Sequence, residues 1–195
     1  MTIGTNDSTA DSTLFRNNNA YNNDGIGGAI YNEGTLNSVC ASGGNVITYA
    51  GIYTGHTGAL VGNGVAIYTT GASSVATITG NTFSGNGSRD YNGTVGTNVS
   101  TAYGGAIYNG TASAMTIRNT TLNNNAATDE GCAIYNDGTL TLGTDGGSDT
   151  SLFRNNYAGN SGGAIRNDGT GMYLNAGTGR TINFTGNVSS PAIVM

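Results

Sequence analysis

A six-residue motif, Gly27-Gly28-Ala29-Ile30-Tyr31-Asn32, occurs five times along this chain of 195 residues, in intact or altered form. The other copies are Gly64-Val-Ala-Ile-Tyr-Thr69, Gly104-Gly-Ala-Ile-Tyr-Asn109, Gly131-Cys-Ala-Ile-Tyr-Asn136 and Gly162-Gly-Ala-Ile-Arg-Asn167. A second motif places an aromatic residue or leucine three residues before an asparagine: Phe15 and Asn18, Phe83 and Asn86, Leu122 and Asn125, Phe153 and Asn156, Phe184 and Asn187. From Leu122 onward both motifs keep a period of 31 residues. Self-similarity at such a period is typical of stacked repeat architectures.

Successive side chains along a strand point to opposite faces, which assigns the motif residues to an inside and an outside. Ile30 is expected to point inward, and Ala29 and Tyr31 outward. The predicted core therefore consists of Ile30, Ile67, Ile107, Ile134, Ile165, Phe15, Phe83, Leu122, Phe153 and Phe184. The outward tyrosines are expected to stack as a column that is a candidate binding face: Tyr31, Tyr68, Tyr108 and Tyr135. Tyrosine also covers a sheet face well without any ligand, and both interpretations stay open.

Each full repeat holds three kinds of strand-like segment, exemplified by Thr150-Ser-Leu-Phe153, Ala164-Ile-Arg166 and Gly138-Thr-Leu-Thr-Leu142. The prediction is an all-β fold: a right-handed, single-stranded parallel β-helix, or solenoid, with three short strands per coil and about five to six coils. Dipeptides such as Asn92-Gly93 are typical of hairpin turns and of an antiparallel sandwich. Hairpins, however, do not require the same residue every 31 positions, whereas stacked coils do.

Residues 1–195 are expected to form one β-helix domain. Within it, residues 1–13 are predicted to be a lead-in or an incomplete first coil. Residues 84–101 are too polar for a core and are predicted to be a loop insertion, and residues 189–195 a C-terminal tail. Loops inserted on one side of a solenoid often build its binding surface.

Asparagines recur at two equivalent positions and are predicted to form structural ladders. In stacked coils, each amide can donate a hydrogen bond to one neighbouring amide and accept one from the other. A buried amide left without a partner costs about 1–3 kcal/mol, so these positions are expected to matter for stability. The two ladders are predicted to consist of Asn32, Asn109, Asn136 and Asn167, and of Asn18, Asn86, Asn125, Asn156 and Asn187.

Charge and composition exclude several classes of protein. The net charge is −5, only 9 % of residues are charged, and all six basic residues are arginines. A basic stripe of the kind that binds nucleic acid is therefore absent from the sequence. No apolar run reaches the length of about 18 residues that a membrane span needs. Glycine is abundant, with 34 residues, but disordered chains lack regularly placed aliphatic residues.

The sequence gives little support for catalysis, and we expect no enzyme, no cofactor and no metal. His56 is the single histidine and cannot by itself make a zinc site. The segment Asp145–Asp149 offers oxygen atoms for Ca²⁺ but does not match the known calcium repeat. Cys40 and Cys132 are expected to be free, packed thiols. One acidic column is expected to be a solvated turn rather than a catalytic pair: Glu33, Asp137 and Asp168.

Together, the Gly-Gly-Ala-Ile and Phe-x-x-Asn repeats resemble those of the polymorphic outer-membrane protein family, over roughly residues 12–188. The passengers of that family are autotransporter-like, secreted right-handed β-helices, and many are adhesins. The resemblance therefore implies an extracellular or cell-surface location.

The leading functional hypothesis is an extracellular structural solenoid, a stalk or a fibre-forming subunit that associates with itself through its coil ends. Its basis is that the repeat runs toward both ends without an evident polar cap, which solenoids need to stay soluble. The alternative is an adhesin segment that binds glycans or a host surface through the tyrosine face or the loop at residues 84–101. An ice-binding protein, suggested by Thr139 and Thr141, and a polysaccharide lyase rank lower.

Overall fold

The computed structural model describes residues 1–4, 12–20, 26–40, 46–54, 63–88, 103–131, 133–144 and 149–189. These residues form strands β1 to β23 and no helix. Every strand pairing within the described ranges is parallel, and the strands build four sheets. We name three sheets after residues of their motifs, as the Phe sheet, the Ile sheet and the Leu sheet. The fourth, made of two-residue strands that follow the Phe-x-x-Asn motif, is the corner sheet.

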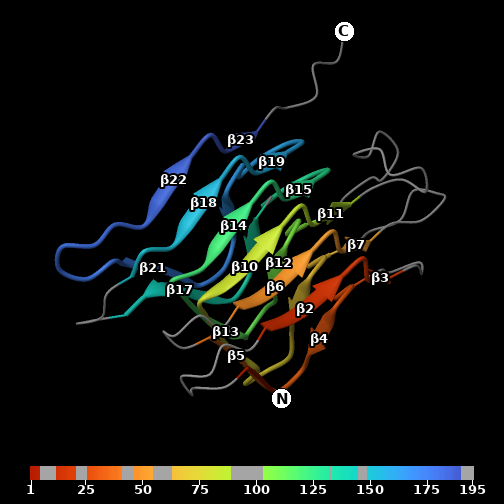
Figure 1. Ribbon diagram of the computed structural model, residues 1–195, viewed down its shortest axis with the longest axis horizontal. Coiled ribbons are helices and arrows are strands. Elements are labelled where there is room, and N and C mark those ends of the chain that lie inside the picture. Colours follow the sequence, from red (N-terminus) through yellow and green to blue (C-terminus); the bar gives the residue numbers. More distant parts are fainter. Residues whose placement is uncertain are drawn as a thin grey trace, which may run out of the picture.

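The chain visits the four sheets in a fixed order. The Phe sheet consists of β2 (Ser12–Arg16), β6 (Val46–Ala50), β10 (Asn81–Ser84), β14 (Thr121–Asn123), β18 (Leu152–Arg154) and β22 (Asn183–Thr185). The corner sheet follows with β3 (Asn19–Ala20), β7 (Tyr53–Thr54), β11 (Gly87–Ser88), β15 (Ala126–Ala127), β19 (Tyr157–Ala158) and β23 (Val188–Ser189). Figure 1 shows the strands of the Phe sheet side by side, in the order of the coils.

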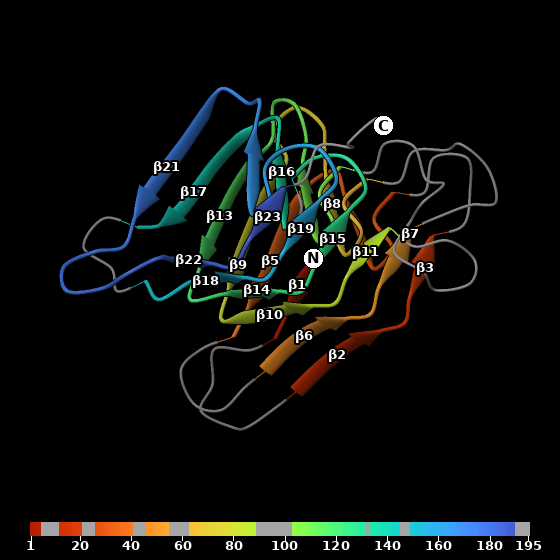
Figure 2. The same ribbon diagram turned by 90° about the horizontal axis from the view of Figure 1, so that it is seen from above.

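The Ile and Leu sheets complete each coil. The Ile sheet consists of β4 (Ile30–Asn32), β8 (Ile67–Thr69), β12 (Ile107–Asn109), β16 (Ile134–Asn136) and β20 (Ile165–Asn167). The Leu sheet consists of β1 (Thr2–Ile3), β5 (Thr35–Val39), β9 (Val75–Thr79), β13 (Ala114–Arg118), β17 (Thr139–Gly143) and β21 (Gly171–Asn175). Figure 2, seen from above, shows β13, β17 and β21 successively stacked along one wall. The five full coils are β2–β5, β6–β9, β10–β13, β14–β17 and β18–β21, and we number them from 1 to 5.

The prediction of a parallel β-helix is confirmed, and so is its length, with five full coils and a sixth begun by β22 and β23. The prediction of three strands per coil is wrong, because the corner sheet adds a fourth. Each corner strand has only two residues and directly follows the asparagine position of the Phe-x-x-Asn motif. Two residues are too few for the alternation by which a strand is recognised in a sequence.

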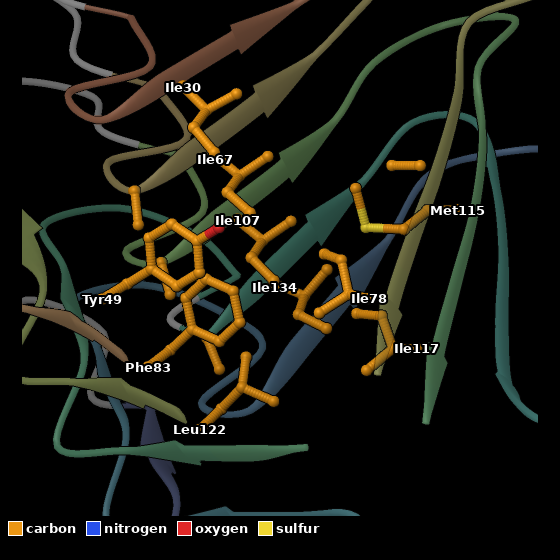
Figure 3. Packing of buried hydrophobic residues seen from close by; sticks show 14 of the residues in the cluster. Ile30, Tyr49, Ile67, Ile78, Phe83, Ile107, Met115, Ile117, Leu122 and Ile134 are labelled. Atoms are coloured by element: carbon orange, nitrogen blue, oxygen red, sulfur yellow. The ribbon is translucent and has the colours of Figure 1, made fainter. Parts of the chain in front are cut away.

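The register places like residues over like residues. Ile107 pairs with Ile67 on one side and Ile134 on the other, and Phe153 lies between Leu122 and Phe184. Figure 3 shows the isoleucine column facing Tyr49, Phe83 and Leu122 across the interior. Six of the ten predicted core residues have no exposed surface: Ile67, Ile107, Ile134, Phe83, Leu122 and Phe153. Ile30 is also buried.

The coil ends depart from this pattern. Phe15 and Ile165 are partly buried against the core. Phe184 was expected inside, yet 43 % of its surface is exposed. The ring stacks on Phe153 with a centroid distance of 4.7 Å, but no strand of the described ranges pairs with the other edge of β22. At the C-terminal end, an inward position is thus left partly exposed when no further coil covers it.

The second coil contains core residues that the repeat motifs did not identify. Tyr49 occupies the aromatic position, stacked between Phe15 and Phe83 at centroid distances of 4.8 and 4.6 Å. Its hydroxyl lies 3.0 Å from Ser38 Oγ, and Asn81 Nδ2 donates to the same Ser38 Oγ at 2.9 Å. Burial raises the pKa of Tyr49 to about 12, against the opposing effect of the Ser38 hydrogen bond. The buried hydroxyl is therefore neutral and hydrogen-bonded.

The expected lead-in, loop insertion and tail overlap only in part with the described residues. Thr2 and Ile3 of the lead-in form β1, which pairs with β5 of the Leu sheet. Of the expected insertion at residues 84–101, Ser84 ends β10 and Gly87–Ser88 form β11. Residues 89–101 and the tail residues 190–195 lie outside the described ranges, as do His56 and Cys132.

Candidate functional site

The tyrosine column is the most regular feature of the outer surface. The rings of Tyr31, Tyr68, Tyr108 and Tyr135 stack on the Ile sheet at successive centroid distances of 5.4, 4.7 and 5.2 Å. The planes of neighbouring rings differ by only 5–6°. Because the rings cover one another's faces, the column presents mainly ring edges and hydroxyl groups to solvent. Tyr31, at its first position, is 47 % exposed.

Glycines at the start of each Gly-Gly-Ala-Ile motif make room for this column. Gly131 has φ of +62°, and a Cβ on it would lie 2.6 Å from the Ile134 carbonyl oxygen and 2.9 Å from Tyr135 Cβ. Gly104 is similar, with φ of +66° and only 2.2 Å from such a Cβ to the Ile107 carbonyl oxygen. A side chain at either position would combine an unfavourable backbone conformation with a clash. The motif thus fixes the corner that precedes each tyrosine.

Carboxylates bind the hydroxyl groups at both ends of the column. Tyr31 Oη donates to Glu33 Oε1 at 2.9 Å, and Tyr135 Oη donates to Asp168 Oδ2 at 2.8 Å. Between them, Asp137 accepts a hydrogen bond from Thr111 Oγ1 at 2.5 Å. The acidic column of Glu33, Asp137 and Asp168, which was expected to be a solvated turn, therefore lies beside the tyrosines. Its carboxylates accept hydrogen bonds from two of the tyrosine hydroxyls.

The pKa values of the column tyrosines are raised. Burial is the main cause for Tyr108, where neighbouring Tyr68 and Asp137 add to it and the pKa reaches about 12. At Tyr135 burial again leads, and the hydrogen bond to Asp168 raises the pKa further. At Tyr31 the hydrogen bond to Glu33 is the largest cause. All these phenols are therefore protonated at neutral pH.

Arg166 takes the place of the fifth tyrosine, in register with Tyr135. Its Nε lies 2.7 Å from Asp168 Oδ1 and 3.7 Å from Glu130 Oε2. Burial alone would raise the pKa of Asp168, but the hydrogen bonds from Tyr135 and Arg166 and the charge of Arg166 outweigh it and lower that pKa. The two ion pairs belong to a partly exposed network, in which Ser161 Oγ also donates to Glu130 Oε1 at 2.8 Å.

The asparagines of the Phe-x-x-Asn motif form a buried ladder at the corner. Asn125 Oδ1 accepts from the backbone N–H and the Nδ2 of Asn86, at 3.1 and 3.0 Å. Asn125 Nδ2 in turn donates to the Phe83 carbonyl and to Asn156 Oδ1. Asn156 binds Asn187 in the same way, with Nδ2 to Oδ1 at 2.7 Å. Ile52 interrupts the series, and its backbone N–H donates to Asn86 Oδ1.

The asparagines that end the Ile strands form a second, shorter ladder. Asn109 Nδ2 donates to Asn136 Oδ1 at 2.6 Å, and Asn136 Nδ2 donates to Asn167 Oδ1 at 2.5 Å. Asn32 lies two coils away and is separated from them by Thr69. Thr69 Oγ1 and Asn109 Oδ1 are both buried without a hydrogen-bond partner. The ladder is therefore incomplete in the second coil.

The other side chains considered for metal binding or catalysis are buried and have structural roles in the described ranges. Asp149, at the end of the oxygen-rich segment Asp145–Asp149 at which no metal was expected, is buried and accepts hydrogen bonds from the backbone N–H groups of Ser151 and Asn119. Cys40 is a buried free thiol, and burial raises its pKa. Nowhere in these ranges do three or more His, Cys, Asp or Glu side chains gather as metal ligands would. The same part of the chain also contains no apolar helix of membrane-spanning length.

Comparison with known proteins identifies the repeats. Residues 12–33 and 150–168 match the Chlamydia polymorphic membrane protein repeat. Each matched segment contains one Phe-x-x-Asn motif and one Gly-Gly-Ala-Ile motif. No curated protein and no solved structure matches the chain. The resemblance inferred from the two motifs is thus confirmed, and the chain carries repeats of the Chlamydia polymorphic membrane protein type.

Proposed function

We propose that the chain is an extracellular structural solenoid at a cell surface, and that copies of it stack end to end into a stalk or fibre. The surface location is supported by the two segments that match a repeat of membrane proteins. The stacking is supported by one observation in particular, the exposed interior of the last coils. This observation carries the proposal.

Inward-facing side chains at the C-terminal end of the solenoid are exposed, whereas the equivalent side chains of the preceding coil are buried. Leu174 is 57 % exposed, whereas Leu142, its partner in the preceding coil, is fully buried. Phe184 and Phe153 differ in the same way. Burying one such side chain contributes about 1.5–3 kcal/mol. A further coil laid over this end would recover that free energy.

The backbone at this end is also ready for pairing. In the described ranges β20, β21, β22 and β23 are each the last strand of their sheet. At the opposite end β2, β3 and β4 are each the first strand of theirs. An unpaired strand edge is a template for another strand. Because the two ends differ, copies would join head to tail, which produces a filament unless the rotation closes a ring.

The test compares the wild-type chain with Leu174→Asp by sedimentation velocity and negative-stain electron microscopy. A charge at the end face is costly to bury, so the variant should remain monomeric at concentrations where the wild type forms rods. Val75→Asp is the matched control, because Val75 lies on the side wall in β9 and is 41 % exposed. A wild-type chain that stays monomeric at every concentration would contradict the proposal. Equal loss of rods in both variants would contradict it too.

The alternative is an adhesin that binds glycans through the tyrosine column. Its support is weaker, because stacking leaves ring edges and hydroxyls, rather than ring faces, for a ligand. A glycan array compares the wild type with the variant in which Tyr31, Tyr68, Tyr108 and Tyr135 are changed to Ser. Hits that vanish in the variant would favour the adhesin, and hits that persist would exclude this face.

A further inference from the structure

We propose that the tyrosine column is a site of oxidative cross-linking, at which a peroxidase-type oxidant with hydrogen peroxide joins neighbouring tyrosines into dityrosine. The bond would connect one coil covalently to the next. The closest pair is Tyr68 and Tyr108, with ring centroids 4.7 Å apart and planes 6° from parallel. This inference does not depend on the proposed stacking of copies, because both rings belong to one chain.

The reaction needs two phenoxyl radicals within bonding reach. Each phenol loses one electron and one proton, and the two radicals then couple through ring carbons ortho to the oxygen. Loss of the two ortho hydrogens as protons, with return of two protons to the oxygens, restores both aromatic rings. In sum, two tyrosines give one dityrosine, two protons and two electrons, and hydrogen peroxide accepts these to form two water molecules.

Stacking supplies the proximity. Rings held in register are already oriented toward each other, and such preorganisation is worth a high effective concentration. An effective concentration of the order of 1 mM exceeds a protein concentration of about 10 µM by about a hundredfold. Coupling within the chain should therefore dominate over coupling between chains in dilute solution.

Carboxylates at the two ends supply proton acceptors. Tyr31 Oη lies 2.9 Å from Glu33 Oε1, and Tyr135 Oη lies 2.8 Å from Asp168 Oδ2. A base within hydrogen-bond distance can take the proton as the electron leaves. Both ends are therefore suited to the first oxidation, and Tyr31 is the more accessible one, with 47 % of its surface exposed.

Other tyrosines of the same chain provide internal controls. Tyr157 and Tyr173 are 43 and 60 % exposed, as accessible to an oxidant as Tyr31. In the described ranges no other tyrosine ring stacks on either of them. Tyr49 is stacked, but it is fully buried and its neighbours are Phe15 and Phe83, whose rings are not phenols. These three tyrosines therefore distinguish the effect of solvent exposure on cross-linking from the effect of ring stacking.

The experiment treats the chain at about 10 µM with a peroxidase and hydrogen peroxide, in the Leu174→Asp background so that any assembly through the end face is suppressed. Dityrosine fluorescence, denaturing gel electrophoresis and peptide mass mapping report the product. We expect a monomeric product in which peptides containing Tyr68 and Tyr108 are joined with the loss of two hydrogen atoms. Its yield should not depend on protein concentration.

Substitutions then assign the site. Tyr108→Phe should abolish the cross-link between the peptides that contain residues 68 and 108. The pairs Tyr31–Tyr68 and Tyr103–Tyr135, with ring centroids 5.4 and 4.8 Å apart, remain able to couple in this variant. Tyr157→Phe and Tyr173→Phe should leave the yield unchanged. The cross-link closes a loop of 40 residues, from position 68 to position 108, and should raise Tm by about 5–10 °C. Cross-links formed mainly through Tyr157 or Tyr173, or the absence of joined peptides containing Tyr68 and Tyr108 from the oxidised wild type, would overturn the proposal.

The role of the carboxylates has its own readout. Glu33→Gln keeps a hydrogen-bond acceptor at Tyr31 but removes the base, so the initial rate of dityrosine formation should fall several-fold. Far-ultraviolet circular dichroism and Tm, measured before oxidation, should match the wild type. A rate unchanged in Glu33→Gln and in Asp168→Asn would show that the carboxylates do not assist the oxidation.

Discussion

The second coil (β6–β9) and the fourth coil (β14–β17) have the same strands but different side chains at their corners. In the fourth coil Asn125 and Asn136 each bind asparagines of the coils on both sides. In the second coil Ile52 and Thr69 occupy these positions, and Thr69 Oγ1 has no partner. The inward residues of both coils are nonetheless buried. The aliphatic positions therefore suffice for the register, while the amide ladders add stability only where asparagines follow one another.

The largest expected effect is that of Asn125→Leu, which breaks the ladder in the regular coil. The change removes the acceptor of the Asn86 backbone N–H and the hydrogen bond that Asn125 Nδ2 donates to the Phe83 carbonyl. Asn86 Nδ2 loses its bond to Asn125 Oδ1 but keeps its bond to the Tyr49 carbonyl. Each buried unsatisfied group costs about 1–3 kcal/mol, so the free energy of unfolding should fall by about 3 kcal/mol or more. Chemical denaturation at constant m-value measures this loss.

Asn18→Leu is the matched control for that change, because Asn18 lies next to Ile52, where the ladder is already interrupted. Its loss should stay below about 1 kcal/mol. Equal losses at positions 18 and 125 would show that the ladder adds nothing beyond the individual side chains.

Thr69→Asn should restore the asparagine ladder in the second coil and stabilise it. The new amide would lie between Asn32 and Asn109 and could donate to Asn109 Oδ1, which now has no partner. Satisfying a buried acceptor contributes about 1–2 kcal/mol, so Tm should rise by about 2–6 °C for a chain of this size. Thr70→Asn, one residue away at a partly exposed position, should not raise Tm.

Tyr49→Phe tests the other special feature of the second coil at nearly constant volume. Phenylalanine keeps the stack with Phe15 and Phe83, and Ser38 Oγ keeps its hydrogen bond from Asn81. The loss should therefore be about 1 kcal/mol, the net value of one hydrogen bond. The Tyr49 phenol, whose pKa burial raises to about 12, should also titrate only in strongly alkaline solution. A loss of several kcal/mol would mean that the polar cluster, rather than the ring stack, holds this coil together.

The smallest effect is expected from Asp168→Asn, measured as a function of pH. The folded state lowers the pKa of Asp168, so its contribution is present above the unfolded pKa and is lost as the pH falls through the folded pKa. The wild type should exceed the variant by about 0.2–1 kcal/mol at neutral pH, as for exposed ion pairs, and the difference should shrink in acid. A difference that grows as the pH falls would contradict this assignment.

Repetition explains how much of this fold could be predicted from the sequence. Isoleucines and asparagines that return at one period give the coil, the inward face and the ladders directly. The two-residue corner strands have no period of their own, and Tyr49 and Ile52 fall where the Phe-x-x-Asn motif is lost. The bond between Tyr135 and Asp168 joins residues 33 positions apart, so it could be found only once the coil register placed them together. Covered ring faces likewise follow from stacking distances, which a sequence does not contain.

The central claim is that equivalent residues lie over one another in parallel, adjacent strands. Two cysteine pairs on the outer walls test it, in a chain with Cys40 and Cys132 changed to Ala: Thr116→Cys with Thr141→Cys, and Thr82→Cys with Thr121→Cys. Neighbouring strands lie about 4.8 Å apart, within disulfide range, so both pairs should oxidise readily. The pair Thr116→Cys with Thr139→Cys is two residues out of register and should not. Oxidation of this mismatched pair, with neither of the two register pairs forming a disulfide, would contradict the parallel solenoid.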